Sequence, residues 1–256
     1  MFSKLIYEGI EKIYNTDLNS QKVYIDNICN LVRHMKSDII YELKGFFVPN
    51  DDYMKIMMGG EIALVGYDCY DSYGNCKWNN YLVFPIYNIS GEIVGLTGFN
   101  PINKLKQQES EEFWNLEVYK KSSKVLFDAG NYIFSKRDIF SEAREKGYII
   151  LTDGNFDTIS ALQEGLVAGA LLGSYFSEVI IAILKFIDIV YLSVDNDEAG
   201  LNLLRQLRRY LPNVRAIRQN KFKDLDDLLK SPYKEDFLEA LDKNRKSKYN
   251  IDLIFR

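Results

Sequence analysis

The fold is decided by residues 147–219, GYIILTDGNFDTISALQEGLVAGALLGSYFSEVIIAILKFIDIVYLSVDNDEAGLNLLRQLRRYLPNVRAIRQ. Short apolar runs of strand character (148–152, 166–173, 188–194 and 214–219) alternate with runs whose apolar residues recur at helical spacing (156–165, 177–187 and 198–211). Such alternation predicts a parallel sheet with right-handed crossovers and helices on both faces. The fold class of this part of the chain is therefore α/β.

The preceding residues have a different, mixed character. Helical periodicity runs through 3–15 and 20–36, whereas 61–71, 81–88 and 91–99 are short β-rich runs, the last two joined by the turn sequence NISG. The polar segment 103–124 is expected to be a long loop or a partly helical excursion. We therefore expect an N-terminal mixed α+β subdomain over 1–140, the parallel-sheet domain over 141–232, and a short helical C-terminal tail over 233–256, so that the chain is α+β overall.

Composition excludes several classes of protein. The net charge of −4 argues against a chain that coats nucleic acid by charge alone, but it permits acidic metal sites and local basic patches. Three scattered cysteines and one histidine form no Cys-x-x-Cys pair, so no zinc site is expected. The longest apolar run, 179–194, is broken by Lys185 and Asp188 too early to span a bilayer, and the N-terminus does not read as a signal peptide. We expect a cytoplasmic protein with no membrane partner.

Acidic residues follow three of the four predicted strands. They are Asp153 and Asp157 after the first strand, Asp195 and Asp197 after the third, and Asp224, Asp226 and Asp227 after the fourth. In an open parallel sheet, ligands gather outside the carboxyl ends of the strands. Carboxylates brought together there repel one another unless a cation lies between them, and oxygen ligands suit Mg²⁺ or Mn²⁺. Gly154 and Gly200 would allow close backbone approach near such a site.

A structural interpretation of the same acids stays open. Asp-x-Asp alone is a weak signal, since acidic residues before a helix commonly cap it and complement its dipole. Convergence of three strand ends favours the metal site for the set as a whole. Asp227 is expected to lie on the surface.

Several motifs, in order, resemble those of a Toprim domain and of the catalytic core of bacterial DnaG-type primases. They are TDGNFD (152–157), DNDEAG (195–200) and KDLDDLL (223–229), preceded by YLVFPIYNISGEIVGLTGF (81–99) and VYKKSSKVLFDAGNYIF (118–134). The resemblance covers roughly Tyr67 to Leu229. It implies a Toprim domain whose central parallel sheet is flanked by helices.

The resemblance also implies a mechanism. Asp195 and Asp197 would hold the Mg²⁺ or Mn²⁺, Asp153 would act as general base or further ligand, and Asp157, Asp224 and Asp226 would complete or orient the site. The reaction would be RNA primer synthesis from ribonucleoside triphosphates on a single-stranded DNA template. The protein partner would be a replicative helicase or another replication protein. The source would be a phage or mobile element, and a viral protein of this kind would act in the host cytoplasm.

The sequence departs from the family pattern in ways that keep two other functions open. The family's Glu before the glycine is Asp153, one methylene shorter, and arginines expected around the hairpin are replaced by Asn79, Asn80, Tyr81 and Phe99. These departures favour a primase-like binding or assembly factor that has lost priming. A Toprim nuclease using the same metal is the third hypothesis.

Two basic clusters are candidates for binding nucleic acid. One comprises Lys120, Lys121 and Lys124, and the other Arg205, Arg208 and Arg209 on the predicted helix 198–211. The alternative for the arginines is a solvated helix face. Trp78 and Trp114 could stack on bases, but core or loop anchoring is the expected role for both.

Overall fold

The computed structural model divides the chain into two compact units, Met1–Phe127 and Asp128–Arg256. It describes residues 11, 17–32, 34–49, 76, 78–103, 122–125, 129–173, 175–193, 198–219 and 221–255. The boundary between the units lies earlier than the one expected at residue 140. Most of the expected helix 3–15 and the whole of the expected strand 61–71 lie outside the described residues.

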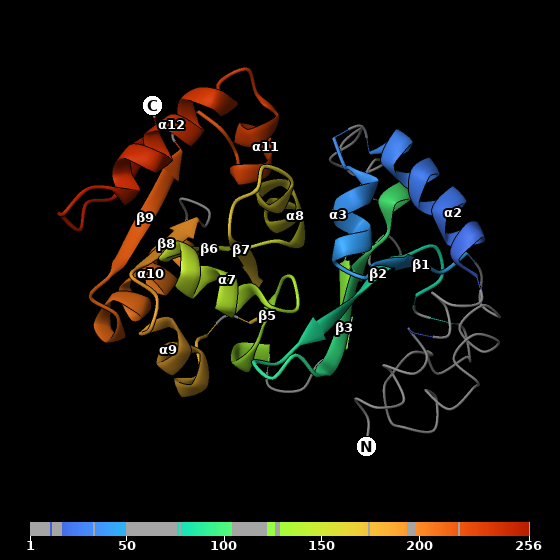
Figure 1. Cartoon of the computed structure of the whole chain (residues 1–256), viewed down its shortest axis with the longest axis horizontal. Coiled ribbons are helices and arrows are strands. Elements are labelled where there is room, and N and C mark those ends of the chain that lie inside the picture. The colour runs from blue at the N-terminus through green and yellow to red at the C-terminus, as the bar shows by residue number, and fades with distance from the viewer. Residues whose placement is uncertain are drawn as a thin grey trace. The chain divides into compact units, whose positions relative to one another are not determined.

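The described part of the first unit combines helices with an antiparallel sheet (Figure 1). The helices are α2 (Leu18–Leu31) and α3 (Ser37–Glu42), and the strands are β1 (Phe46–Phe47), β2 (Leu82–Tyr87), β3 (Ile93–Phe99) and β4 (Ser122–Val125), in that spatial order. The expected hairpin is confirmed. Asn88 Oδ1 accepts the backbone N–H groups of Ser90 and Glu92, and Gly91 supplies the positive φ of 74° that the turn requires.

One expectation in this unit needs correction. Residues 122–124 were expected to continue a loop or a partly helical excursion, but they belong to β4, which pairs with β3. The serine and lysine residues here carry no apolar alternation. The strand forms because the edge of β3 offers unpaired backbone groups.

The second unit is built on a six-stranded sheet with the order β10-β9-β8-β6-β7-β5. Its strands are β5 (Ile133–Phe134), β6 (Tyr148–Thr152), β7 (Ala168–Leu171), β8 (Ile189–Ser193), β9 (Val214–Gln219) and β10 (Leu253–Phe255). All neighbours are parallel except β5, which runs antiparallel to β7. The expected α/β class with a central, largely parallel sheet is confirmed.

Helices connect these strands, and three of them lie where the sequence predicted helices, at 156–165, 177–187 and 198–211. They are α7 (Ile139–Lys146), α8 (Asn155–Gln163), α9 (Glu178–Leu184), α10 (Glu198–Tyr210), α11 (Leu225–Lys230) and α12 (Lys234–Arg245), with a 3₁₀ turn, η3, at Ala129–Asn131. Gly147 and Gly165 follow α7 and α8 with left-handed φ values of 74° and 71°. The Ser177 side chain caps α9 by accepting the Ile180 N–H at 3.3 Å.

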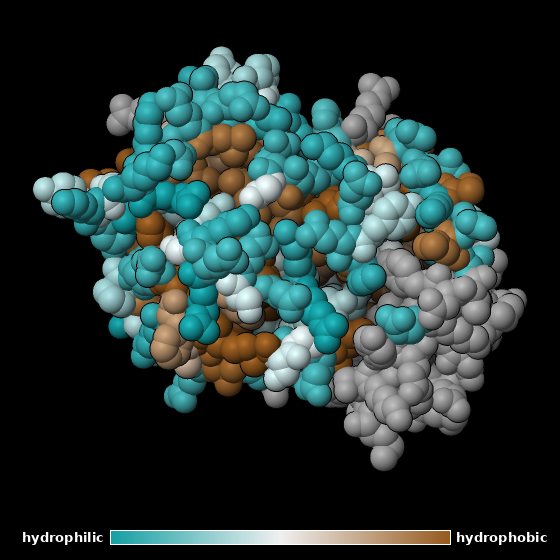
Figure 2. Space-filling view, in the orientation of Figure 1, coloured by the Kyte–Doolittle hydropathy of each residue, from teal (hydrophilic) through white to brown (hydrophobic). Residues whose placement is uncertain are grey.

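The helices cover both faces of this sheet, and the strands are almost completely buried as a result. In Figure 1, α7, α9 and α10 lie on one side of the sheet and α8, α11 and α12 on the other. Arg245 of α12 stacks over the Tyr148 ring at 4.0 Å, which fixes α12 against the start of β6. Figure 2 shows a largely hydrophilic surface with an exposed apolar area in the region of α9, where Tyr175, Val179 and Phe186 are exposed.

The C-terminal residues contain more than the expected helix. After α12, which the sequence predicted, Leu253–Phe255 form β10 and pair in parallel with Ile217–Gln219 of β9. No helix in the described part of the chain is both long enough and apolar enough to cross a membrane.

Candidate functional site

The two central strands of the second unit end side by side. β6 and β8 are paired in parallel register, so that Thr152 lies opposite Ser193, and both residues are buried. The Thr152 hydroxyl donates to the Gly154 carbonyl at 3.1 Å, which leaves its oxygen to accept from the Thr158 hydroxyl at 2.7 Å. These bonds fix the turn that leads from β6 into α8.

Asp153 lies on this turn and is exposed. Within the part of the chain that the structure describes, its carboxylate makes no hydrogen bond or ion pair. An exposed carboxylate with no protein donor, at the carboxyl edge of a parallel sheet, fits the role of a ligand for a hard divalent cation.

Gly154 permits a close contact between the turn and α8. A Cβ atom at this position would lie 3.1 Å from Asp157 Oδ2, so the Asp157 carboxylate stands directly beside the Gly154 backbone. A side chain at residue 154 would therefore crowd the Asp157 carboxylate, while the supporting role of Gly154 at a metal site stays a prediction. Gly200, also expected to support the site, is buried in the first turn of α10.

The first and third acidic motifs meet at the contact between α8 and α11. The Asp226 backbone N–H donates to Asp157 Oδ1 at 2.9 Å. Asp226 is only 6% exposed, and its two carboxylate oxygens accept hydrogen bonds from Ser160 Oγ and from Lys230 Nζ, the latter also an ion pair at 2.5 Å. Both carboxylates are thus held by protein donors.

Asp224 lies at the start of α11 and caps it. One carboxylate oxygen accepts the Asp227 N–H at 2.8 Å, which is the capping role that sequence patterns allow for acids before helices. Asp227 is exposed, as expected. Partial burial, together with the carboxylates of Asp224 and Asp226, raises the pKa of Asp227 above its ordinary value of 3.8.

The remaining expected ligands and most of the lysine cluster lie outside the described residues. This applies to Asp195, Asp197, Lys120 and Lys121, and Lys124 is described for its backbone only. Among the described side chains, no group of three or more His, Cys, Asp or Glu residues is arranged to hold a metal ion. The metal site therefore stays a prediction that depends on Asp195 and Asp197.

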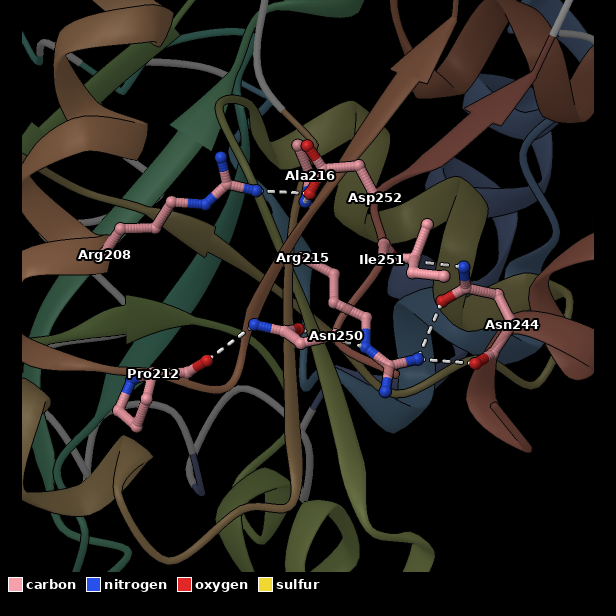
Figure 3. Close-up of polar contacts among 8 residues, drawn as sticks. All are labelled: Arg208, Pro212, Arg215, Ala216, Asn244, Asn250, Ile251 and Asp252. Carbon is pink, nitrogen blue, oxygen red and sulfur yellow. Dashed lines mark hydrogen bonds and ion pairs between the residues drawn. The ribbon is translucent and has the colours of Figure 1, made fainter. Parts of the chain in front are cut away.

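The arginines of α10 make contacts within the chain. Arg205 Nη1 bonds Glu198 Oε1 at 3.2 Å and Asn202 Oδ1 at 2.9 Å, whereas Arg208 forms an ion pair with Asp252, shown in Figure 3. Arg209 is exposed. Carboxylate partners neutralise two of the three charges that sequence analysis assigned to nucleic acid.

Sequence analysis missed the partners of Asp226. Lys230 follows Asp226 by four residues, a spacing at which oppositely charged side chains meet on a helix. This ion pair could therefore have been predicted from the sequence. The contact with Ser160 could not have been predicted, since Ser160 is an ordinary polar residue of a predicted helix and its partner lies 66 residues away in the chain.

Comparison with known proteins supports the fold and the family resemblance. Residues 150–229 match the family model of Toprim-like domains. The chain is 29% identical to the DNA primase of Thermotoga maritima over 182 residues, which are 68% of this chain and 30% of that protein. The chain thus spans less than a third of the curated primase that it matches.

Solved structures of primase catalytic cores share the fold. The catalytic core of the E. coli primase superposes with a TM-score of 0.68 at 17% identity, covering 95% of this chain and 80% of that chain. A DnaG primase catalytic domain bound to single-stranded DNA gives a TM-score of 0.66 at 17% identity, covering 91% of this chain and 74% of that one. The expected resemblance to Toprim domains and to the DnaG-type catalytic core is confirmed.

Proposed function

We propose that this chain is a DNA primase-like nucleotidyltransferase that makes RNA primers on single-stranded DNA and depends on a divalent cation. The observation that carries the proposal is the in-register ending of β6 and β8, which presents the exposed Asp153 at the carboxyl edge of the sheet. In the chain, Asp195 follows Ser193, the last residue of β8, by two residues. The primase relatives support the same reaction class.

The residues of this edge would divide the work between them. Asp153, Asp195 and Asp197 would hold Mg²⁺ or Mn²⁺, with one oxygen of Asp224 as a further ligand. The cation would bind the triphosphate of the incoming nucleotide and stabilise the charge on the displaced pyrophosphate. Thr152 and Gly154 keep the Asp153 turn fixed, so that Asp153 is positioned as a ligand or as the base for the attacking hydroxyl.

The biological setting belongs to the same proposal. A primase of this kind would act in the cytoplasm, that of the host if the source is a phage or mobile element. It would use a single-stranded template and ribonucleoside triphosphates, beside a replicative helicase or another replication protein.

A non-catalytic, primase-like binding or assembly factor is the second candidate, and the hairpin of the first unit favours it. Two of the positions where arginines were expected are core positions. Phe99 is fully buried and stacks with Phe84 at 6.1 Å, and Tyr81 packs edge-on against the buried Trp78 at 5.8 Å. Arginine at either position would place a charge in the core of the sheet.

The deciding experiment is incorporation of labelled ribonucleotides by the purified full chain on single-stranded DNA with Mg²⁺ or Mn²⁺. We expect short RNA products from the native chain and none from Asp195→Asn. Asp188→Asn is the matched control and should stay active. Asp188 is exposed and precedes Ile189, the first residue of β8, so it lies at the opposite end of this strand from the candidate site. Unchanged turnover in Asp195→Asn would remove the metal-site assignment.

Two other outcomes identify the other candidates. Cleavage of DNA without added nucleotides would indicate the nuclease, and the absence of both activities together with stable association with another protein would indicate the binding factor. Asp153→Glu restores the family's longer side chain. A gain in incorporation would show that the site is weakened but intact.

A further inference from the structure

Among the acidic residues that are expected to bind the cation and that the structure describes, Asp226 is the least accessible. It is 6% exposed, and both of its carboxylate oxygens are bonded to protein donors, Ser160 Oγ and Lys230 Nζ. We propose that Asp226 is a positioning residue that sets the other acids of the carboxyl edge, and that it is not a cation ligand. This inference rests on the proposed function.

The contacts of Asp226 join two helices. Its backbone N–H donates to Asp157 and its side chain accepts from Ser160, and these two residues lie one turn apart on the same face of α8. Lys230, on α11 itself, holds the second carboxylate oxygen. The start of α11 is therefore fastened to α8 at two successive points.

The charge of Lys230 argues against a cation at the same carboxylate. The ammonium group lies 2.5 Å from Asp226 Oδ2, with the Lys230 side chain 23% exposed and the Asp226 side chain 9% exposed. A divalent cation on Asp226 would have to approach this ammonium group or displace it from a largely buried pair. Asp153, exposed and without a protein donor among the described residues, presents no such obstacle.

The position of Asp226 is transmitted to both neighbouring acids. Asp157, held by the Asp226 N–H, stands beside Gly154, the residue that follows Asp153. Asp224 precedes Asp226 by two residues and caps the same helix, α11. A shift of Asp226 would therefore move the turn that carries Asp153 and the cap that carries Asp224.

The test compares three single variants of the full chain: Asp226→Asn, Ser160→Ala and Lys230→Met. Mn²⁺ binding is measured by calorimetry, below the melting temperature of each variant, together with ribonucleotide incorporation. We expect all three variants to bind the native number of Mn²⁺ ions with an affinity weakened by about tenfold, and to lose incorporation in parallel, since orienting residues around metal ligands have effects of this size. In the double variant Asp226→Asn/Lys230→Met, the fold-loss of Mn²⁺ affinity should be smaller than the product of the fold-losses in the two single variants.

The opposing outcomes are distinct. Loss of a bound Mn²⁺ in Asp226→Asn alone, with native behaviour in Ser160→Ala and Lys230→Met, would show that Asp226 is a ligand. Lower melting temperatures with native Mn²⁺ affinity would show a purely structural role, and either result overturns the proposal while the proposed function stands. A native chain that binds no Mn²⁺ and incorporates no nucleotide would overturn both.

Discussion

At the scale of single residues, Gly98 of β3 lies where a side chain has no room. A Cβ atom there would come within 2.6 Å of the Leu82 carbonyl oxygen, 3.1 Å of Val83 Cα and 3.2 Å of the Trp78 ring. Two of these three neighbours are backbone atoms of the paired strand and cannot move independently. Gly98 is therefore part of the reason that the buried Trp78 fits over the hairpin.

We expect Gly98→Ala to lower the free energy of unfolding by about 2 kcal/mol through overpacking. The measurement is urea unfolding followed by circular dichroism. Gly165→Ala is the control, because nothing lies within 4 Å of its added Cβ and only the cost of its positive φ remains, about 1 kcal/mol. Equal losses in the two variants would contradict the steric explanation.

Asp227 offers a test of electrostatics at the same scale. Its pKa is raised in the folded chain by burial and by Asp224 and Asp226, so the folded state binds this proton more tightly than the unfolded state does. The contribution of Asp227 to stability is therefore most favourable at low pH. It falls as the pH rises from the ordinary value of 3.8 through the raised pKa.

We therefore expect Asp227→Asn to raise the melting temperature at pH 7, with the difference from the native chain disappearing toward pH 3. The Asp227 backbone N–H, which the Asp224 cap requires, is retained in this variant. Asp236→Asn is the control, since Asp236 is exposed in the first turn of α12, where its removal loses only a favourable interaction with the helix dipole. A melting temperature that falls in both variants at pH 7 would contradict the repulsion of the Asp227 carboxylate by Asp224 and Asp226.

The sequence could reveal the chemical type of single residues and their order in the chain. It could not reveal which of them are buried or hydrogen-bonded. Asp153 and Asp226 are both aspartates just beyond predicted strands, and nothing local distinguishes them. Only the fold shows that Asp153 is exposed and that Asp226 is buried between Ser160 and Lys230. Burial and long-range donors depend on packing between elements far apart in the chain.

At the scale of elements, the alternation from β6 to β9 was predictable and the two outer strands of the sheet were not. The inner strands are buried over most of their four to six residues because both faces are covered, and β6, β7 and β8 are largely apolar, which gives a clear signal. β5 has two residues and β10 has three, too few to show any periodicity. β10 depends instead on polar contacts that bring the C-terminal residues to β9.

Those contacts centre on Arg215 of β9, which Figure 3 shows beside Asn244 and Asn250. Its guanidinium donates to the carbonyl and side-chain oxygens of Asn244, to the Ser247 carbonyl and to Asn250 Oδ1. Asp252 accepts the Ala216 N–H at 2.8 Å and pairs with Arg208. Arg215 is thus a buried anchor of the C-terminal segment.

We expect Arg215→Ala to lower the free energy of unfolding by about 3 kcal/mol, because it removes the hydrogen bonds that the buried guanidinium makes to Asn244, Ser247 and Asn250. Arg208→Ala should cost less than about 1 kcal/mol, since its side chain is 42% exposed. Arg209→Ala, at an exposed position of the same helix, is the control and should change stability by less than about 0.5 kcal/mol. Equal effects of Arg215→Ala and Arg209→Ala in urea unfolding would show that the contacts in Figure 3 do not anchor the segment.

At the scale of the whole molecule, the net charge of −4 limits how the chain can bind DNA. Binding must rely on a local concentration of unneutralised cations, because the chain as a whole repels a polyanion. Arg205 and Arg208 are paired with Glu198 and Asp252. Lys120, Lys121 and Lys124 lie within residues 118–127, which contain no acidic residue. We therefore expect the lysine cluster, rather than the arginines, to bind phosphates.

We expect replacement of all three lysines by alanine to weaken binding of a labelled oligodeoxythymidine, measured by fluorescence anisotropy over a range of salt concentrations. The slope of log K against log salt should become shallower by about 0.7 for each phosphate that a lysine no longer neutralises. The matched triple variant at Arg205, Arg208 and Arg209 should keep the native slope, because two of its charges are already neutralised by carboxylates of the same unit. A shallower slope in the arginine variant alone would instead show that α10 exchanges its ion pairs for phosphates and is the DNA-binding surface.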